Sequence, residues 1–444
     1  MKELVLDVRL DGFDAPIGVL ARDAKGAMAF AYTDAHLKHA APAPLSLSLP
    51  LGDDAFSDEA ARPYFENLLQ ERDGALKQVM DRENLSRDDI AGLLFHLGRD
   101  CAGAVSVLPQ GAAPSKVPGD LAKDYETLSD AQMEELVRAL HTRAPLPDHI
   151  RDPSPLSGVQ SKIALTRLPG GEFAKPREGS GAPTTHIIKA PDERHKDDAI
   201  YENAAMTLSD RLLLRTADAA AVSFGEVKVL LTRRFDRAVS PEGRVTRIHQ
   251  EDFAQALGLP PSLKYERYGE GQRIFNTDAI ARVIGQTSDP KAASEFFVRA
   301  SLFDILIGNV DGHAKNFALL HEAGAITMAP RYDVMPTRLD PKFTPDFAFK
   351  VGAAENLDSL KLADLEAFGR RFGVALDDLT NWAASYANDL CAAFGELDRM
   401  YARKFANLIA DNVETLLKTL KRPVPDAVKD RDAFVGKGGG WSTS

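Results

Sequence analysis

Asp311, Asn316 and Asp333 have the residue types and the order of a phosphoryl-transfer site. In kinases, an Asp accepts the proton of the substrate hydroxyl, an Asn at D-x-x-x-x-N spacing holds one metal ion, and a later Asp holds metal on the phosphates of the nucleotide. These types suit the chemistry because Mg²⁺ prefers carboxylate, amide and phosphate oxygens, and because a reacting hydroxyl needs an acceptor within hydrogen-bond reach. The pattern therefore indicates phosphoryl transfer.

A surface loop whose Asp and Asn cap turns is the simpler interpretation of the same residues, because a bare D-x-x-x-x-N is common by chance. The flanking elements favour the site. An apolar stretch at helical spacing runs into Gly308-Asn309, and a β-hairpin is expected over 317–320 and 325–329. Since strands rise about 3.3 Å per residue, the hairpin can return the chain to its start and bring Asp333 close to Asn316.

Lys189 is the candidate for the lysine that a nucleotide site needs upstream. It ends the expected strand 186–189, as the ATP-binding lysine does in the V-A-I-K motif of kinases. Glu202 lies early in a helix expected over 199–214, where it would pair with Lys189 and fix its position. Alone, each residue has an ordinary explanation, as an edge-strand charge and as a first-turn helix acid. The order of the elements carries the prediction.

Three other features complete a phosphate site less specifically. The segment 157–162 is small and polar, with one glycine where backbone could approach phosphate, but it lacks G-x-G-x-x-G and Walker spacing. A turn between two strands explains that segment equally well. Lys315 would neutralise the transferring phosphoryl group, and His313 would either pack the loop through a ring hydrogen bond or take part in the site.

The composition argues against several classes of function. The net charge of the 444 residues is −11, which argues against general nucleic-acid affinity through this chain alone. Cys101 and Cys391 are too few for a disulfide framework and suit a reducing cytoplasm. We find neither a signal-peptide pattern at the start nor an apolar run of about 18 residues that would span a membrane. The expectation is a cytoplasmic protein without membrane contact.

The element pattern divides the chain into four expected regions, 1–145, 146–249, 250–425 and 426–444. The first is an α+β module with a β-meander over 3–33, a short strand over 45–51, a strand over 101–108 and helices capped by Ser86 and Ser129. The second carries the strands 163–168, 186–189 and 227–231. The third is mostly helical apart from the hairpin, and the fourth is a Gly-rich tail expected to be disordered.

Spaced motifs along the chain resemble those of HipA-type serine/threonine kinases, the toxins of bacterial toxin–antitoxin pairs. The resemblance covers roughly residues 1–420 and is specific because many motifs occur in family order. The central match is IleGlyAsnValAspGlyHisAlaLysAsnPhe at 307–317, with TyrAspVal at 332–334. The other matching stretches are 65–69, 100–107, 157–162, 185–191, 234–237 and 250–266.

The resemblance implies an α+β, two-lobed, protein-kinase-like fold that uses ATP and Mg²⁺. Asp311 would be the catalytic acceptor, with Asn316 and Asp333 as metal ligands. The implied nucleotide contacts are the phosphate loop Ser157, Gly158, Val159, Gln160, Ser161 and Lys162, the lysine Lys189 with its partner Glu202, the loop residue His313, and Arg233 and Phe235 in the adenine hinge at 232–235.

The resemblance also implies partners and a biological role. Family members phosphorylate aminoacyl-tRNA synthetases, which stalls translation and causes growth arrest or persistence. They also bind a small helix-turn-helix antitoxin that sits on operator DNA. We expect the same classes of partner for this chain.

Two positions depart from the family pattern. Members often carry an autophosphorylated Ser three residues before the loop glycine, where this chain has Pro155, which has no hydroxyl. Ser157, directly before Gly158, is the expected autophosphorylation site, and Ser154 is the alternative. Arg233 stands where relatives often have Glu, which affects the expected side-chain contacts to adenine.

Two other functions fit parts of the pattern. A kinase that acts on a lipid or small molecule would use the same core, although the chain lacks an amphipathic basic helix for a membrane surface. An inactive kinase fold could instead act with the antitoxin as a transcriptional co-repressor. The presence of Lys189, Asp311, Asn316 and Asp333 favours the enzyme.

Overall fold

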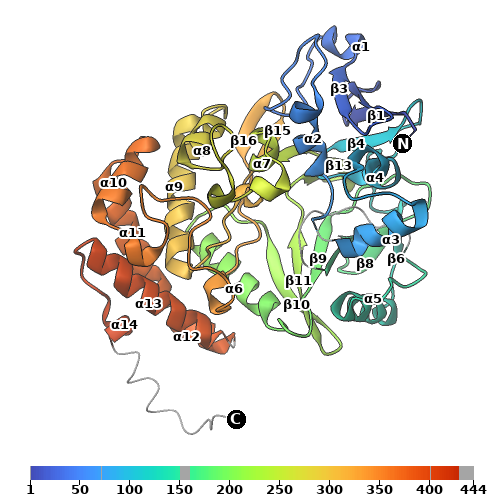
Figure 1. Ribbon diagram of the computed structural model, residues 1–444. Helices are drawn as coiled ribbons and strands as arrows, with labels where there is room; N and C mark the ends of the chain where they lie inside the picture. Colours follow the sequence, from blue (N-terminus) through green and yellow to red (C-terminus); the bar gives the residue numbers. More distant parts are fainter. Residues whose placement is uncertain (1, 72, 151–160, 401, 430–444) are drawn as a thin grey trace.

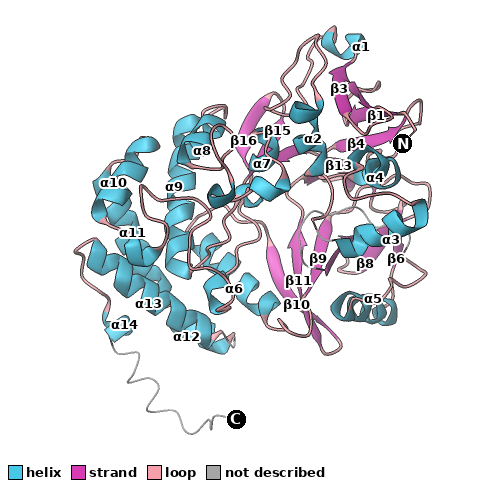
Figure 2. Ribbon diagram, viewed as in Figure 1, coloured by secondary structure: helices cyan, strands magenta, loops and turns pink. Residues whose placement is uncertain are grey.

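The computed structural model describes residues 2–71, 73–150, 161–400 and 402–429. Strands fill much of the N-terminal half of the chain (Figure 1), whereas helices dominate the C-terminal part (Figure 2). This content confirms the α+β class. No helix within the described ranges has the length and apolar character needed to cross a membrane. The tail expected to be disordered over 426–444 begins with an ordered helical turn at 426–429, because Val428 is buried against the helical core. The rest of that tail lies outside the described residues.

The first module is a four-stranded antiparallel sheet with helices packed against it. The meander expected over 3–33 is confirmed, and inward residues at every second position, such as Leu6 and Val8, are fully buried. The sheet has the order β3-β2-β1-β4. Its strands are β1 (Leu4–Leu10), β2 (Gly18–Arg22), β3 (Met28–Tyr32) and β4 (Val105–Pro109), and the helices are α1 (Asp34–Leu37), α2 (Asp58–Glu66), α3 (Asp73–Glu83), α4 (Ile90–Leu97) and the 3-10 turn η1 (Gly98–Asp100).

Three local predictions in this module are wrong. The segment 45–51 forms no strand but a turn closed by one bridge between Ser46 and Leu49, since the amides of Leu45 and Leu47 donate to side chains elsewhere in the fold and not to a neighbouring strand. The helix expected after Ser86 begins later, because the side chain of Asp89 caps it by accepting from the Gly92 amide at 2.9 Å. The strand expected over 101–108 shortens to β4 because Gly103 turns the chain with φ of 68°.

A six-stranded antiparallel sheet forms the second region, in the order β10-β11-β9-β7-β8-β6. Helices α5 (Asp130–Thr142), capped by Ser129 as expected, and α6 (Asp198–Arg211) cover its opposite faces. Val229 and Leu231 pack with α5 whereas Leu230 packs with α6, as the alternation of a strand requires. The strands are β6 (Tyr125–Thr127), β7 (Ser161–Arg167), β8 (Phe173–Pro176), β9 (His186–Ala190), β10 (Ala219–Phe224) and β11 (Val227–Arg233).

The packing of β6 and α5 bears on the expected boundary at residue 145. Both elements precede that residue, yet they pack with the second sheet and not with the first. A proline-rich segment does follow α5, but it separates two elements that pack against each other, helix α5 and strand β7. The change of packing lies between β4 and β6.

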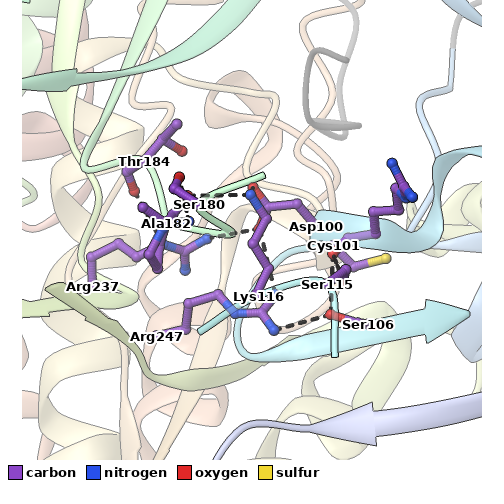
Figure 3. A network of polar contacts seen from close by, with 12 residues as sticks. Asp100, Cys101, Ser106, Ser115, Lys116, Ser180, Ala182, Thr184, Arg237 and Arg247 are labelled. Atoms are coloured by element: carbon purple, nitrogen blue, oxygen red, sulfur yellow. Dashed lines mark hydrogen bonds and ion pairs between the residues drawn. The ribbon is translucent and has the colours of Figure 1, made fainter. Parts of the chain in front are cut away.

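Buried charges join the first module to the second. Asp100, at the end of η1, lies 3.2 Å from the Lys116 ammonium and 3.4 Å from the Arg247 guanidinium (Figure 3). Arg247 also binds Asp11 at 2.6 Å. A small sheet in the order β12-β13-β5 carries Arg237 on β12 and Arg247 on β13. Its strands are β5 (Gly119–Asp120), β12 (Arg237–Val239) and β13 (Arg244–Arg247).

The C-terminal region is built around α9 (Pro290–Ile307), which contacts α8, α11 and α13. Its second half is buried on all sides, which suits its mostly apolar sequence, and the one buried carboxylate there, Asp304, is paired with Arg331. The expected hairpin is confirmed as β15 (Ala318–Glu322) and β16 (Ala325–Met328), joined by β14 (His249–Asp252). The helices are α7 (Phe253–Ala256), α8 (Thr277–Ile284), α10 (Leu362–Arg371), α11 (Leu376–Ala392), α12 (Phe394–Arg399), α13 (Arg403–Thr419) and α14 (Asp426–Lys429); the 3-10 turns are η2 (Pro261–Leu263), η3 (Glu266–Tyr268), η4 (Ala314–Asn316), η5 (Thr337–Leu339) and η6 (Leu357–Ser359).

Candidate active site

The loop 309–316, called the catalytic loop, begins where α9 ends. Gly308 ends the helix with φ of 73°, a left-handed conformation that favours glycine, and a Cβ there would also crowd the Leu408 side chain at 2.8 Å. The Asn309 side chain then donates to Asp304 Oδ1 at 2.9 Å, and Arg331 donates to the same oxygen at 2.5 Å. These buried contacts give the loop a fixed origin.

Asp311 is held from both sides of the catalytic loop. Its amide donates to Asn309 Oδ1 at 3.1 Å, and its carbonyl accepts from Asn316 Nδ2 at 2.8 Å. Its carboxylate accepts a hydrogen bond from the Tyr265 hydroxyl. Burial raises the pKa of Asp311 to about 6, helped by the nearby Asp333 carboxylate and opposed by the Tyr265 hydrogen bond. Such a group is ionised at neutral pH and is a stronger proton acceptor than an ordinary Asp.

Lys189, Glu202 and Asp333 form a chain of ion pairs from three separate elements. The Lys189 ammonium lies 2.6 Å from Glu202 Oε1 and 2.5 Å from Asp333 Oδ1. The expected pairing of Lys189 with Glu202 is therefore confirmed. Burial acts to lower the pKa of Lys189, but the two carboxylates outweigh it and hold that pKa above its usual range. The lysine is thus a fixed positive charge between strand β9 and helix α6.

Asp333 and Asn316 offer the oxygens that a metal ion would need. Asp333 has φ of 55°, an uncommon conformation that Asp tolerates better than most residues and that occurs at functional sites. Its side chain is 46% exposed. Burial acts to raise the pKa of Asp333, but Lys189 and Lys162 hold it well below the usual range, so the carboxylate stays charged.

This donor set fits Mg²⁺ that arrives with a nucleotide. The described residues contain no group of three or more His, Cys, Asp or Glu side chains that would enclose a metal. Mg²⁺ is commonly bound through one or two carboxylates together with substrate phosphates, and not by a cage made only of protein. One carboxylate at Asp333 and one amide oxygen at Asn316 match that habit.

The expected phosphate loop is only partly described. Ser157, Gly158, Val159 and Gln160 lie outside the described residues, and Ser161 and Lys162 belong to strand β7. Lys162 is paired in register with Lys189 on β9. Burial and repulsion from Lys189 lower the pKa of Lys162 to about 8, against the pull of Asp333 and Glu202. A second ammonium therefore faces the same carboxylates.

His313 and Lys315 are both buried in the catalytic loop. Burial lowers the pKa of His313 to about 3, so its ring is neutral, and the ring lies edge-on to Tyr265 at 5.1 Å. The Lys315 ammonium lies 2.7 Å from Asn67 Oδ1 and 3.2 Å from Asp252 Oδ2. These contacts fit a structural role for Lys315, between the first module and the loop, better than the expected contact with the transferring phosphoryl group.

Arg233 is the last residue of strand β11, and Phe235 lies two residues further along the chain. Arg233 is exposed, and its amide donates to the Asp218 carbonyl at 2.7 Å. Phe235 packs against the Tyr332 ring at 5.2 Å, next to Asp333. The segment thus connects the sheet to the metal-ligand candidate, and its role as an adenine hinge stays a prediction.

Sequence reasoning missed three residues at this site. Tyr265 contacts Asp311, Asn67 contacts Lys315, and Glu71 binds Lys264 at 2.5 Å. Asn67 and Tyr265 do lie in stretches that carry the family resemblance, 65–69 and 250–266, and that was the available signal. No spacing rule links them to the loop, because the contacts depend on tertiary packing.

Family models cover both parts of the chain. The HipA-like C-terminal domain matches residues 154–417, and the HipA N-terminal domain matches residues 6–108. The chain is 33% identical over 423 residues to the putative kinase Y4mE of Sinorhizobium fredii. This alignment covers 94% of this chain and 98% of that protein. It is 29% identical over 408 residues to the serine/threonine-protein kinase toxin HipA of Shewanella oneidensis, covering 89% of this chain and 90% of that one.

Among solved structures, the fold is similar to a toxin–antitoxin complex from Shewanella oneidensis MR-1 that contains HipA, HipB and operator DNA. The TM-score is 0.77 at 26% identity, over 96% of this chain and 99% of that chain. The likeness extends through both the N-terminal module and the helical region.

Proposed function

The chain belongs to the HipA family of kinase toxins, and we propose that it is an ATP- and Mg²⁺-dependent serine/threonine protein kinase that acts as the toxin of a toxin–antitoxin pair. The observation that carries this proposal is the ion-pair chain from Glu202 through Lys189 to Asp333, beside Asp311 and Asn316. A kinase needs that lysine–glutamate pair and a metal-binding Asp in place together. All five side chains are present here.

Each residue has a distinct task in the proposed mechanism. ATP supplies the phosphoryl group, and Mg²⁺ neutralises charge on its phosphates. Lys189 binds those phosphates while Glu202 holds its ammonium in place, and Asn316 and Asp333 are the metal ligands. Asp311 accepts the proton of the substrate serine or threonine hydroxyl. Lys162 adds positive charge next to Lys189, where the phosphates would lie.

The proposed partners follow from the family. The solved relative is bound to HipB and to operator DNA. We infer that this chain binds a comparable small helix-turn-helix antitoxin and reaches operator DNA through it, which agrees with its net charge of −11. The proposed substrate is an aminoacyl-tRNA synthetase in the cytoplasm, whose phosphorylation would stall translation and cause growth arrest or persistence.

Labelling with γ-labelled ATP tests the activity. Purified protein with Mg²⁺ and a bacterial lysate is expected to transfer label to one lysate protein, whereas Asp311→Asn is expected to transfer none. Mass spectrometry of the labelled band would name the substrate. Label in a lipid or small-molecule fraction would instead indicate a metabolic kinase. ATP binding without any label would favour an antitoxin-bound co-repressor.

Autophosphorylation is expected at Ser157. Phosphate there would add about two negative charges beside the bound nucleotide phosphates and would weaken ATP binding. Ser157→Ala is therefore expected to remove label from the enzyme itself and to leave transfer to the lysate protein intact. Phosphopeptide mapping, with Ser154→Ala as the matched control, checks this. Label that stays on Ser157→Ala but disappears from Ser154→Ala would contradict it.

A further inference from the structure

Tyr265 lies directly against the catalytic Asp candidate. It sits between η2 and η3, far from the catalytic loop along the chain, and its hydroxyl donates to Asp311 Oδ1. Its ring meets His313 of the same loop edge-on at 5.1 Å. The tyrosine therefore contacts the loop through both its polar and its apolar part.

The position of Tyr265 is set by the residues on either side of it. The Lys264 carbonyl accepts from the Ala314 amide at 3.0 Å, which ties this segment to the catalytic loop. The Glu266 amide donates to the Ala348 carbonyl at 2.9 Å. The Lys264 ammonium reaches Glu71 of the first module at 2.5 Å.

The ring of Tyr265 is fixed as well. The Arg267 guanidinium lies over it at 4.0 Å from the centroid, which is a cation–π distance. Backbone hydrogen bonds on either side, the ion pair of Lys264 and the stacking of Arg267 thus fix the position of Tyr265. The hydroxyl is delivered to Asp311 by a rigid support.

The hydrogen bond from Tyr265 to Oδ1 of Asp311 fixes the direction in which Oδ2 points. The terminal torsion of Asp is broad, so an unsupported carboxylate samples many rotations. Oδ2 of Asp311 has no hydrogen-bond partner among the described residues. With Oδ1 bound by Tyr265, Oδ2 remains available to a substrate hydroxyl in a defined direction.

We propose that Tyr265 is a positioning residue, whose hydroxyl orients the Asp311 carboxylate for proton acceptance from the substrate. The inference rests on the proposed kinase function. A tyrosine that blocked the site would compete for both oxygens or lie on a segment free to leave, whereas Tyr265 uses one oxygen and is pinned on both sides. Removing only the hydroxyl should therefore lower turnover while nucleotide binding stays unchanged.

Tyr265→Phe tests this, with Tyr268→Phe as the matched control. Tyr268 packs on the Tyr265 ring at 5.7 Å, is 59% exposed, and its hydroxyl makes no hydrogen bond within the described ranges. The measurements are the initial rate of label transfer to the lysate protein against ATP concentration, the affinity for a fluorescent ATP analogue, and thermal unfolding. For Tyr265→Phe we expect kcat about tenfold lower, with the KM for ATP within about twofold of wild type. Tyr268→Phe should match wild type in both.

Each other result overturns the proposal in an identifiable way. Equal rates for the two variants would leave the hydroxyl without a role, and a faster Tyr265→Phe would show that the tyrosine blocks the site. Phosphate on Tyr265 itself would make it a substrate. If Tyr265→Phe lowers nucleotide affinity or thermal stability together with kcat, Tyr265 has only a structural role. If wild type transfers no label that Asp311→Asn abolishes, the kinase function fails first, and this inference fails with it.

Discussion

Lys189→Met is expected to lower kcat/KM for phosphoryl transfer by about 100- to 1,000-fold, the loss seen when one well-placed electrostatic contact to a reacting group is removed. The methionine keeps most of the length of the side chain, which becomes one atom shorter, and deletes its charge. Two carboxylates, Glu202 and Asp333, would then face each other without the ammonium that lies 2.6 Å and 2.5 Å from them. Phosphates would lose their cation and meet added repulsion. Label transfer measured against ATP concentration checks the effect.

Two further variants show whether the ion pair acts as a unit. Lys228→Met is the matched control, because Lys228 lies on the adjacent strand β11 and makes no ion pair in the described part of the chain. Its activity should equal that of wild type. Glu202→Gln should cost less than Lys189→Met, and the double variant should be no worse than Lys189→Met alone, since coupled residues are not additive. Additive losses would contradict a shared role, and so would a Lys189→Met enzyme within about tenfold of wild type.

The parts of the site that sequence could predict are those set by local rules. Lys189 lies near the end of a strand with an apolar pattern, Glu202 lies early in a helix with i+4 periodicity, and the hairpin returns the chain toward Asn316. The structure has each element and adds the ion pairs between them. The order of these elements along the chain was informative because the elements are short and their connections allow only a few ways of packing them together.

The parts that sequence could not predict depend on contacts between distant segments. Tyr265 reaches Asp311 from 46 residues away, and Lys315 reaches Asn67 across 248 residues. The Lys315 ammonium has several acceptors within reach of its long side chain, and only packing against the first module selects Asn67 and Asp252. The prediction of a strand over 45–51 was wrong for a related reason. The Ser46 hydroxyl donates to the buried Glu251 at 2.5 Å, and this distant contact holds the segment as a turn.

The charge network between the modules is the other feature that only the fold creates. Asp100 is 4% exposed and lies between Lys116 at 3.2 Å, Arg247 at 3.4 Å and Arg237 at 3.6 Å (Figure 3). Burial acts to raise the pKa of Asp100, but these cations outweigh it and hold that pKa well below its usual range. The carboxylate therefore stays ionised and balances cations contributed by strands β12 and β13 and by the loop before β5. Removing that charge would leave buried cations uncompensated.

Asp100→Asn is expected to lower the free energy of unfolding by about 3–5 kcal/mol at neutral pH, because it breaks a buried charge cluster while keeping the shape of the side chain. Urea unfolding followed by circular dichroism measures this. Asp81→Asn is the matched control, since Asp81 pairs with Lys77 at 3.0 Å on the surface, where such pairs contribute about 0–1 kcal/mol.

The pH dependence separates lost charge from lost packing. Because the folded-state pKa of Asp100 is depressed, its contribution is fully present above the unfolded-state pKa, near 4, and is lost as the pH falls below that value. The difference in stability between wild type and Asp100→Asn should therefore be constant at neutral pH and shrink on acidification below about pH 4. A difference that stays the same in acid would mean that the asparagine disturbs packing. A difference below about 1 kcal/mol at neutral pH would show that the cations do not depend on this carboxylate.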